Sequence, residues 1–138
     1  MNFKYIVAGI VVIGAAVGIG FLALAPKSPC NQGVCKVTVT VQACQANGAT
    51  ATPDPVPVPA ENNIEWTIAT DGYLFTETGI AVQGTGFRNA PGVTGNGKKF
   101  TVHDAYTDIR PNIKYSIEVH PTASTTPCPK TDPFIANQ

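Results

Sequence analysis

The chain has 138 residues and a formal net charge of zero, with nine basic and nine acidic side chains. This length accommodates one domain with a short appendage. Only 13% of the residues are charged, and neither sign is in excess, so the composition excludes the electrostatic footprint of a nucleic-acid-binding protein. Many β-branched residues, punctuated by 12 prolines and 13 glycines, favour an all-β domain.

The N-terminal segment predicts one transmembrane helix. It contains an uncharged run of 21 residues from Tyr5 to Ala25. As a helix this run spans about 30 Å, the thickness of the bilayer core, whereas the apolar core of a cleavable signal peptide has about 7–15 residues. A cleaved signal is the alternative, because Ala23-Leu24-Ala25 resembles a cleavage site, although Pro26 directly follows it. Lys4 favours a cytoplasmic N-terminus, so both interpretations export the rest of the chain.

Four cysteines follow the apolar segment, Cys30, Cys35, Cys44 and Cys128. Oxidising conditions outside the cytoplasm favour disulfides. Residues 35–44, CKVTVTVQAC, alternate like a strand with one apolar face, which places Cys35 and Cys44 roughly 30 Å apart and too far to pair. The short segment before Cys35 also prevents Cys30 from reaching Cys44. The sequence therefore predicts the disulfides Cys30–Cys35 and Cys44–Cys128, in preference to a zinc site.

Beyond this first strand, residues 45–50 predict a turn around Asn47-Gly48. The proline-rich residues 51–62 predict an extended edge or a polyproline-like connection, because proline cannot donate to a sheet ladder. Residues 63–70, NIEWTIAT, predict the central strand of the core. Residues 72–87 predict a loop packed by aromatic side chains, followed by a short strand around residues 80–82.

The remaining segments are predicted in the same way. Residues 88–97, RNAPGVTGNG, indicate a long glycine-rich turn, and two strands follow at residues 98–104 and 113–120. We expect these two strands to form a hairpin that turns near Ile109. The alternation of apolar and polar residues along the strands selects the candidate core residues, which are Ile64, Trp66, Ile68, Phe100, Tyr115 and Ile117.

Six or seven short strands indicate an all-β, Greek-key two-sheet β-sandwich. We expect residues 1–25 to be the anchor or signal, residues 26–35 a linker and residues 36–138 the sandwich. The order of strands is similar to that of the cupredoxin superfamily, and closest to small exported bacterial cupredoxin-like domains. The residues that carry this resemblance are Trp66, the Gly72-Tyr73 turn, Phe100, Asp104, Tyr115, Cys128 and Asp132-Pro133. An immunoglobulin-like sandwich is the alternative.

Copper-binding cupredoxins hold the metal with two histidines, a cysteine thiolate and usually a methionine. The chain has two histidines, His103 and His120, and no methionine except Met1. No cysteine precedes His120 in its strand, and Cys128 is assigned to a disulfide. In the expected hairpin the two histidines point outward, roughly 7–13 Å apart along the sheet. We therefore expect no metal or other cofactor.

Neither histidine has a serine and a carboxylate placed beside it by the strand pattern, so we expect no enzyme. The sequence predicts a membrane-tethered extracytoplasmic β-sandwich that acts by protein contact, as an envelope accessory, interaction or assembly subunit. Its partners would be the membrane, through residues 5–25, and an envelope protein or a second copy. We place the protein in the bacterial inner membrane, single-pass with the C-terminal domain in the periplasm, or in the periplasm after cleavage. A cupredoxin-like electron-transfer or copper-handling protein is the alternative.

Overall fold

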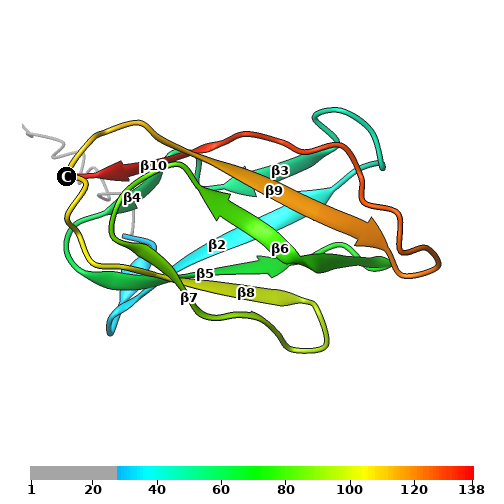
Figure 1. Cartoon of the computed structure of the whole chain (residues 1–138), viewed down its shortest axis with the longest axis horizontal. Coiled ribbons are helices and arrows are strands. Elements are labelled where there is room, and N and C mark those ends of the chain that lie inside the picture. Colours follow the sequence, from blue (N-terminus) through cyan, green and yellow to red (C-terminus); the bar gives the residue numbers. More distant parts are fainter. Residues whose placement is uncertain (1–27) are drawn as a thin grey trace, which may run out of the picture.

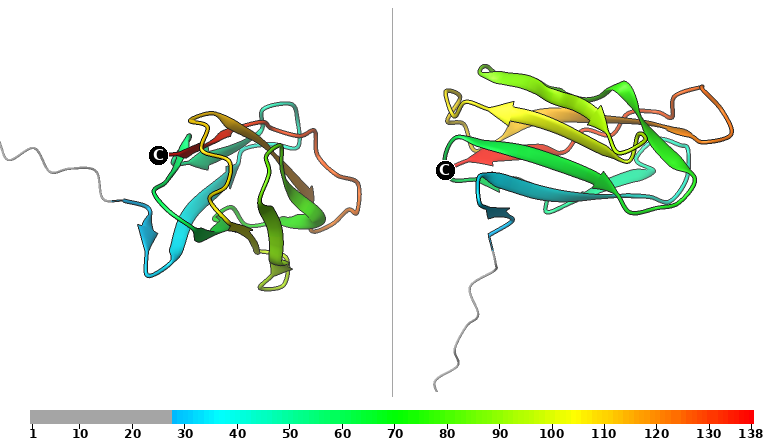
Figure 2. Two further views of the ribbon diagram at one scale, coloured as in Figure 1. Left: turned by 60° about the vertical axis from the view of Figure 1, so that its left-hand side comes forward. Right: turned by 90° about the horizontal axis from the view of Figure 1, so that it is seen from below.

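The structure, a computed structural model, describes residues 28–138, and the predicted membrane segment 5–25 lies outside the described residues. The described chain is a sandwich of two β-sheets, as Figures 1 and 2 show. The prediction of an all-β, two-sheet sandwich is therefore confirmed. Within residues 28–138 the structure contains no helix that could span a bilayer.

Six strands form the larger sheet, in the order β1-β2-β5-β8-β7, with β3 also paired to β2. These strands are β1 (Cys30–Asn31), β2 (Val34–Val41), β3 (Ala49–Thr52), β5 (Asn62–Ile68), β7 (Phe87–Thr94) and β8 (Lys99–Asp104). Four strands form the smaller sheet, in the order β4-β10-β9-β6. These are β4 (Val56–Val58), β6 (Tyr73–Val82), β9 (Ile113–Pro121) and β10 (Phe134–Asn137).

Two strand pairs are parallel, and the rest are antiparallel. Strand β2 runs parallel to β5 over six residue pairs, from Val34↔Asn63 to Val39↔Ile68. At one edge of the smaller sheet, β4 runs parallel to β10. Strand β1 and the start of β2 lie within residues 26–35, the segment expected as a linker, so the sandwich begins before residue 36.

Three local predictions are wrong. The residues after Gly72 form one long strand, β6. The polar residues between Phe75 and Ile80 interrupt its alternation of apolar and polar side chains, but a register shift there keeps both halves of the strand paired with β9. Residues 88–97 are mostly strand β7, because a second shift, between Asn89 and Gly92, accommodates Pro91. Strands β8 and β9 are not a hairpin, since they belong to opposite sheets.

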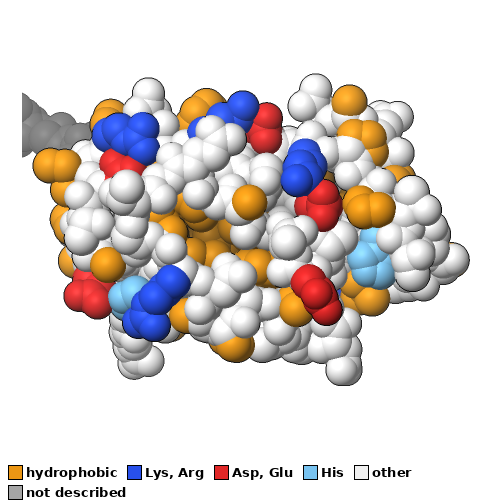
Figure 3. Space-filling view, in the orientation of Figure 1, with side chains coloured by type: hydrophobic (Ala, Val, Ile, Leu, Met, Phe, Trp, Pro, Cys, Tyr) orange, Lys and Arg blue, Asp and Glu red, His pale blue; other side chains and the backbone are white. Residues whose placement is uncertain are grey.

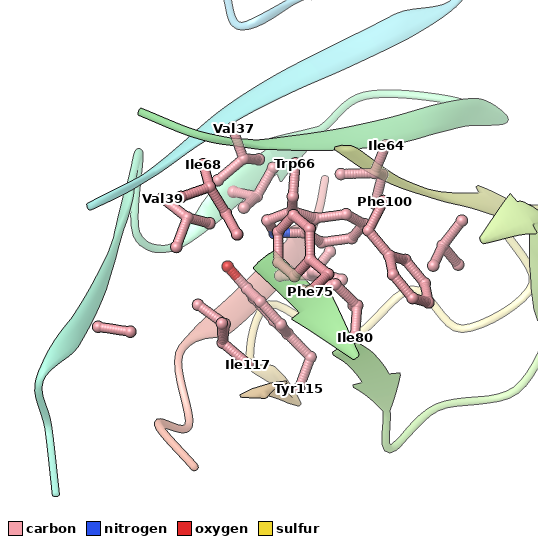
Figure 4. Close-up of a cluster of buried hydrophobic side chains, with 14 of the residues drawn as sticks. Val37, Val39, Ile64, Trp66, Ile68, Phe75, Ile80, Phe100, Tyr115 and Ile117 are labelled. Atoms are coloured by element: carbon pink, nitrogen blue, oxygen red, sulfur yellow. The ribbon is translucent and has the colours of Figure 1, made fainter. Parts of the chain in front are cut away.

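The core lies between the sheets and contains all six predicted side chains. Trp66, Ile64, Phe100 and Tyr115 are fully shielded from solvent, and Ile68 and Ile117 nearly so. Figure 4 shows these side chains pointing at one another from both sheets. The Trp66 ring, from the larger sheet, packs at 5.3 Å between centroids on Tyr115 of the smaller sheet. This contact joins the two layers at the centre of the molecule.

Two disulfides are present, and they join the cysteines that the strand distances select. Cys30 and Cys35 are register partners in β1 and β2. Cys44, in the connection from β2 to β3, is bonded to Cys128, in the connection from β9 to β10. The second bridge therefore links the two sheets and closes a loop with a sequence separation of 84.

Candidate functional site

The two histidines lie on different sheets, so the hairpin that was expected to bring them together does not exist. His103 is in β8 of the larger sheet and His120 in β9 of the smaller one. The two pale blue side chains in Figure 3 lie at opposite ends of the molecule. The expected proximity fails because strands that follow each other in the chain are not neighbours in a sheet.

Hydrogen bonds occupy three of the four histidine ring nitrogens. His103 places Nδ1 3.0 Å from Asn63 Oδ1 and Nε2 3.0 Å from Glu61 Oε1. Nδ1 of His120 donates to the carbonyl oxygens of Pro121 and Ser124, at 2.9 and 2.7 Å. These contacts hold both rings in structural roles.

The residues do not fit the copper site that a cupredoxin fold would imply. The sulfur of Cys128, the cysteine nearest to His120 in sequence, is bonded to Cys44 and provides no thiolate. Within residues 28–138, no three histidine, cysteine or carboxylate side chains are grouped closely enough to hold a metal ion. A metal ligand needs several convergent partners, and among the described residues Glu61 is the one carboxylate in contact with a histidine ring.

Two buried carboxylates, neither of which was predicted as a site residue, lie at the end of β8 and in the loop after it. Asp108 forms a bidentate ion pair with Arg110, with Oδ1–Nε and Oδ2–Nη2 distances of 2.7 and 2.6 Å. The Arg110 hydrogen bonds lower the pKa of Asp108 to about 2. Arg110 also donates to the carbonyl oxygen of Gln83, so this pair fastens the β8–β9 loop to the β6–β7 connection.

Asp104 is the second of these carboxylates, and its side chain is fully buried. Burial raises its pKa, against the opposing effect of the Tyr106 N–H, which donates to Oδ1 at 2.8 Å. Its Oδ2 has no hydrogen-bond partner among the described residues. The titratable groups that act on its pKa are His103, which lowers it, and Asp108, which raises it.

A feature suited to binding a strand is a cleft of mixed polarity between the edges of the two sheets. Strand β6 ends the smaller sheet and β7 ends the larger one, and the two are not hydrogen-bonded to each other. A cleft of about 290 Å³ lies between them. Figure 3 shows apolar side chains in a hollow on this face. We call this cleft the open seam, and it is lined by Thr78, Ile80, Ala81, Val82, Phe87, Arg88, Asn89 and Val102.

The seam borders an edge strand that contains no proline. Proline interrupts β4 at Pro57 and β7 at Pro91, and Pro53 directly follows β3. Such prolines prevent unwanted pairing at sheet edges. Strand β6 has no proline and no basic residue, and Glu77 is its only charged side chain. The edge of β6 along the seam is therefore suited to pairing with another strand.

Only the first half of β6 is covered by the chain itself. The N–H of Phe75 donates to the carbonyl oxygen of Gly97, at 2.8 Å, in the turn between β7 and β8. Gly97 lies so close to Leu74 that an added Cβ would stand 3.1 Å from the leucine Cβ. The second half, from Thr78 to Val82, faces the seam. No pattern in the sequence predicts this site, because it depends on edges from two different sheets.

Comparison with known proteins adds no assignment for this chain. No protein family matches the sequence, and no curated protein matches it either.

Proposed function

We propose that this protein is a membrane-tethered, extracytoplasmic β-sandwich that acts by protein contact, as an accessory or assembly subunit of the bacterial envelope. The open seam carries this proposal. It combines apolar side chains at the surface with an edge strand that has no proline and no basic residue, and an extended segment of a partner can use both. Backbone pairing along β6 would supply affinity, and the cleft would select the side chains of the partner.

The cysteines support the extracytoplasmic location. Two disulfides fit an oxidising compartment, since cytosolic thiols are kept reduced. We further propose that residues 5–25 remain attached as the anchor, because their uncharged run is as long as a bilayer core is thick. In that arrangement the sandwich stands in the periplasm on a single-pass inner-membrane helix.

The sheet pairing favours a cupredoxin-like sandwich over an immunoglobulin-like one. Immunoglobulin sandwiches consist of two antiparallel sheets. Here the parallel pair β2–β5 lies within the larger sheet and extends over six residue pairs. Fold alone does not assign function, however, and the contacts of His103, His120 and Cys128 give no support to copper-based electron transfer.

Affinity capture of the full chain, extracted from its own membrane, tests the proposal with a matched pair of variants. Ala81→Lys places a charged side chain on the edge of β6 at the seam, where it should block strand pairing. Thr40→Lys makes the same addition at an exposed position of β2. We expect one companion protein, or a second copy, with the unsubstituted chain and Thr40→Lys, and its loss with Ala81→Lys. Equal recovery from all three chains, or no companion at all, would contradict the proposal.

A further inference from the structure

The end of the sandwich from which the chain continues toward residue 27 carries an apolar groove of about 450 Å³. Four prolines from three segments line it, Pro29, Pro53, Pro57 and Pro59, together with Ser28 and Gln138 at the two ends of the described chain. No ionisable side chain is among the lining residues. A groove with so many apolar lining residues is suited to an interaction.

Next to the groove, Ile109 projects from the β8–β9 loop with 71% of its surface exposed, and it is the more exposed of the two large hydrophobic residues that the described chain leaves in solvent. Its position is fixed by backbone contacts on both sides. Asn137 Nδ2 donates to the carbonyl oxygen of Asp108 at 2.7 Å, and Asn137 N–H donates to that of Arg110 at 3.1 Å. The N–H of Gln138 donates to the carbonyl oxygen of Val58, which joins this loop to the groove.

These features lie together at one end of the molecule. In Figures 1 and 2 the C-terminus, the β8–β9 loop and the point where the described chain begins are at the same end of the sandwich. The charged pair beside Ile109 is self-neutralising, because the carboxylate of Asp108 is paired with Arg110. The end surface therefore combines the proline groove, an exposed isoleucine and a compensated ion pair.

We propose that this end of the sandwich docks onto the surface of the lipid bilayer, with Ile109 and the prolines of the groove in the interfacial layer. The inference rests on the proposed anchor. Only Pro26 and Lys27 separate Ala25, the last residue of the apolar run, from Ser28 at the groove. Three residue steps reach about 10 Å at most, so an anchored chain holds this end within the headgroup region. Apolar side chains at that depth bind in proportion to the area they bury.

Docking by the end keeps the open seam accessible. The seam lies on the face seen in Figure 3, whereas the groove and Ile109 lie at the end of the sandwich. If the domain stands on this end, its strands point away from the membrane, and a strand of nine residues such as β9 rises about 30 Å. The face with the open seam is then perpendicular to the membrane plane. A partner anchored in the same membrane could then reach β6.

Tryptophan quenching tests the docking in the full chain, reconstituted in vesicles of phosphatidylethanolamine and phosphatidylglycerol that include a lipid brominated high on its acyl chain. The native Trp66 is fully buried and serves as the unquenched reference. Ile109→Trp and Pro59→Trp place probes at the docking end, and both positions are exposed. Ala123→Trp, at an exposed position in the β9–β10 connection, is the matched control at the other end.

We expect the added emission of Ile109→Trp and Pro59→Trp to be largely lost with the brominated lipid, and that of Ala123→Trp to be unchanged. If the chain floats with the vesicles but none of the probes is quenched, or all three are quenched equally, docking by this end is overturned and the anchor stands. If the chain fails to float, or mass spectrometry of the native membrane form shows cleavage before Ser28, the anchor is overturned and the docking with it.

Discussion

The edges of the two sheets meet along two flanks of the sandwich. The two flanks differ in how the edges are held together. On one flank the chain crosses from β3 to β4, the Cys44–Cys128 disulfide ties the sheets together, and Asp54 accepts the N–H of Phe134 at 3.0 Å. On the other flank residues 83–86 connect β6 to β7, no disulfide of the described chain joins the two strands, and apolar side chains reach the surface. The disulfide closes the stapled flank, and the open flank is the one that we propose for binding.

The largest expected effect concerns the core that both flanks share. Trp66→Ala should lower the free energy of unfolding by about 3–5 kcal/mol, because it removes the largest fully buried side chain and leaves a cavity. Val82→Ala at the seam, where the side chain is half-buried, should cost only about 1 kcal/mol. Urea denaturation of both variants measures the difference. Equal losses would show that Trp66 is peripheral to the stability of the domain.

The stapled flank can be opened by replacing Cys44 and Cys128 with serine. We expect a loss of about 4 kcal/mol, because the bridge restricts a long loop in the unfolded chain, against about 2 kcal/mol for the same change at Cys30 and Cys35. The sequence separations of the two bridges are 84 and 5. Denaturant midpoints of the two double variants decide the point. A greater loss from the short bridge would contradict the assignment of the Cys44–Cys128 bridge as the main staple.

At the end of the open flank, the Asp108–Arg110 pair should make stability depend on acidic pH. The pKa of Asp108 is about 2 in the folded protein and about 3.9 when unfolded, so its contribution is complete above pH 4 and is lost as the pH falls through 2. Asp108→Asn should remove this part of the dependence. The contribution of Asp108 is measured by thermal unfolding of both proteins between pH 5 and 2. The difference between the two curves is used because Glu118, whose pKa is also lowered, contributes to the pH dependence of each protein. Parallel curves would show that the pair is not coupled to folding.

The smallest expected effect is that of added copper, since neither flank provides a thiolate ligand for it. The domain loaded with Cu(II) is expected to stay free of the intense visible absorption of a copper–thiolate bond, because Cys128 is bonded to Cys44. Copper bound at His103 or His120 should be weak, and each site should be lost independently on its own His→Ala change. A strong visible band would restore the electron-transfer alternative.

The features that could be predicted from the sequence are those set by local pattern or by distance along a strand. Alternation in residues 63–70 places Trp66 inward, and the length of the first strand excludes a bond between Cys35 and Cys44. The burial of Asp104 was also foreseeable, since it alternates with Phe100 and Val102 on the inward face of β8. Its burial was not predicted because a charged side chain is normally expected to face solvent.

What the sequence did not reveal depends on how strands far apart in the chain associate. Pro91 and Gly92 suggest a turn, yet a bulge keeps β7 paired with β8 on both sides of them. No local pattern assigns β8 and β9 to different sheets, so the expected hairpin was wrong. The open seam follows from that assignment, because it lies between two edges that only the complete topology defines.

Site-specific photocrosslinking in intact cells tests the central proposal, contact through the open seam, most directly. A photoreactive residue is placed at Ala81, on the edge of β6, and in a separate chain at Thr40, on the exposed face of β2. We predict a discrete crosslinked product, to an envelope protein or to a second copy, from position 81 and none from position 40. Products of equal yield from both positions, or no product from position 81, would contradict the proposal.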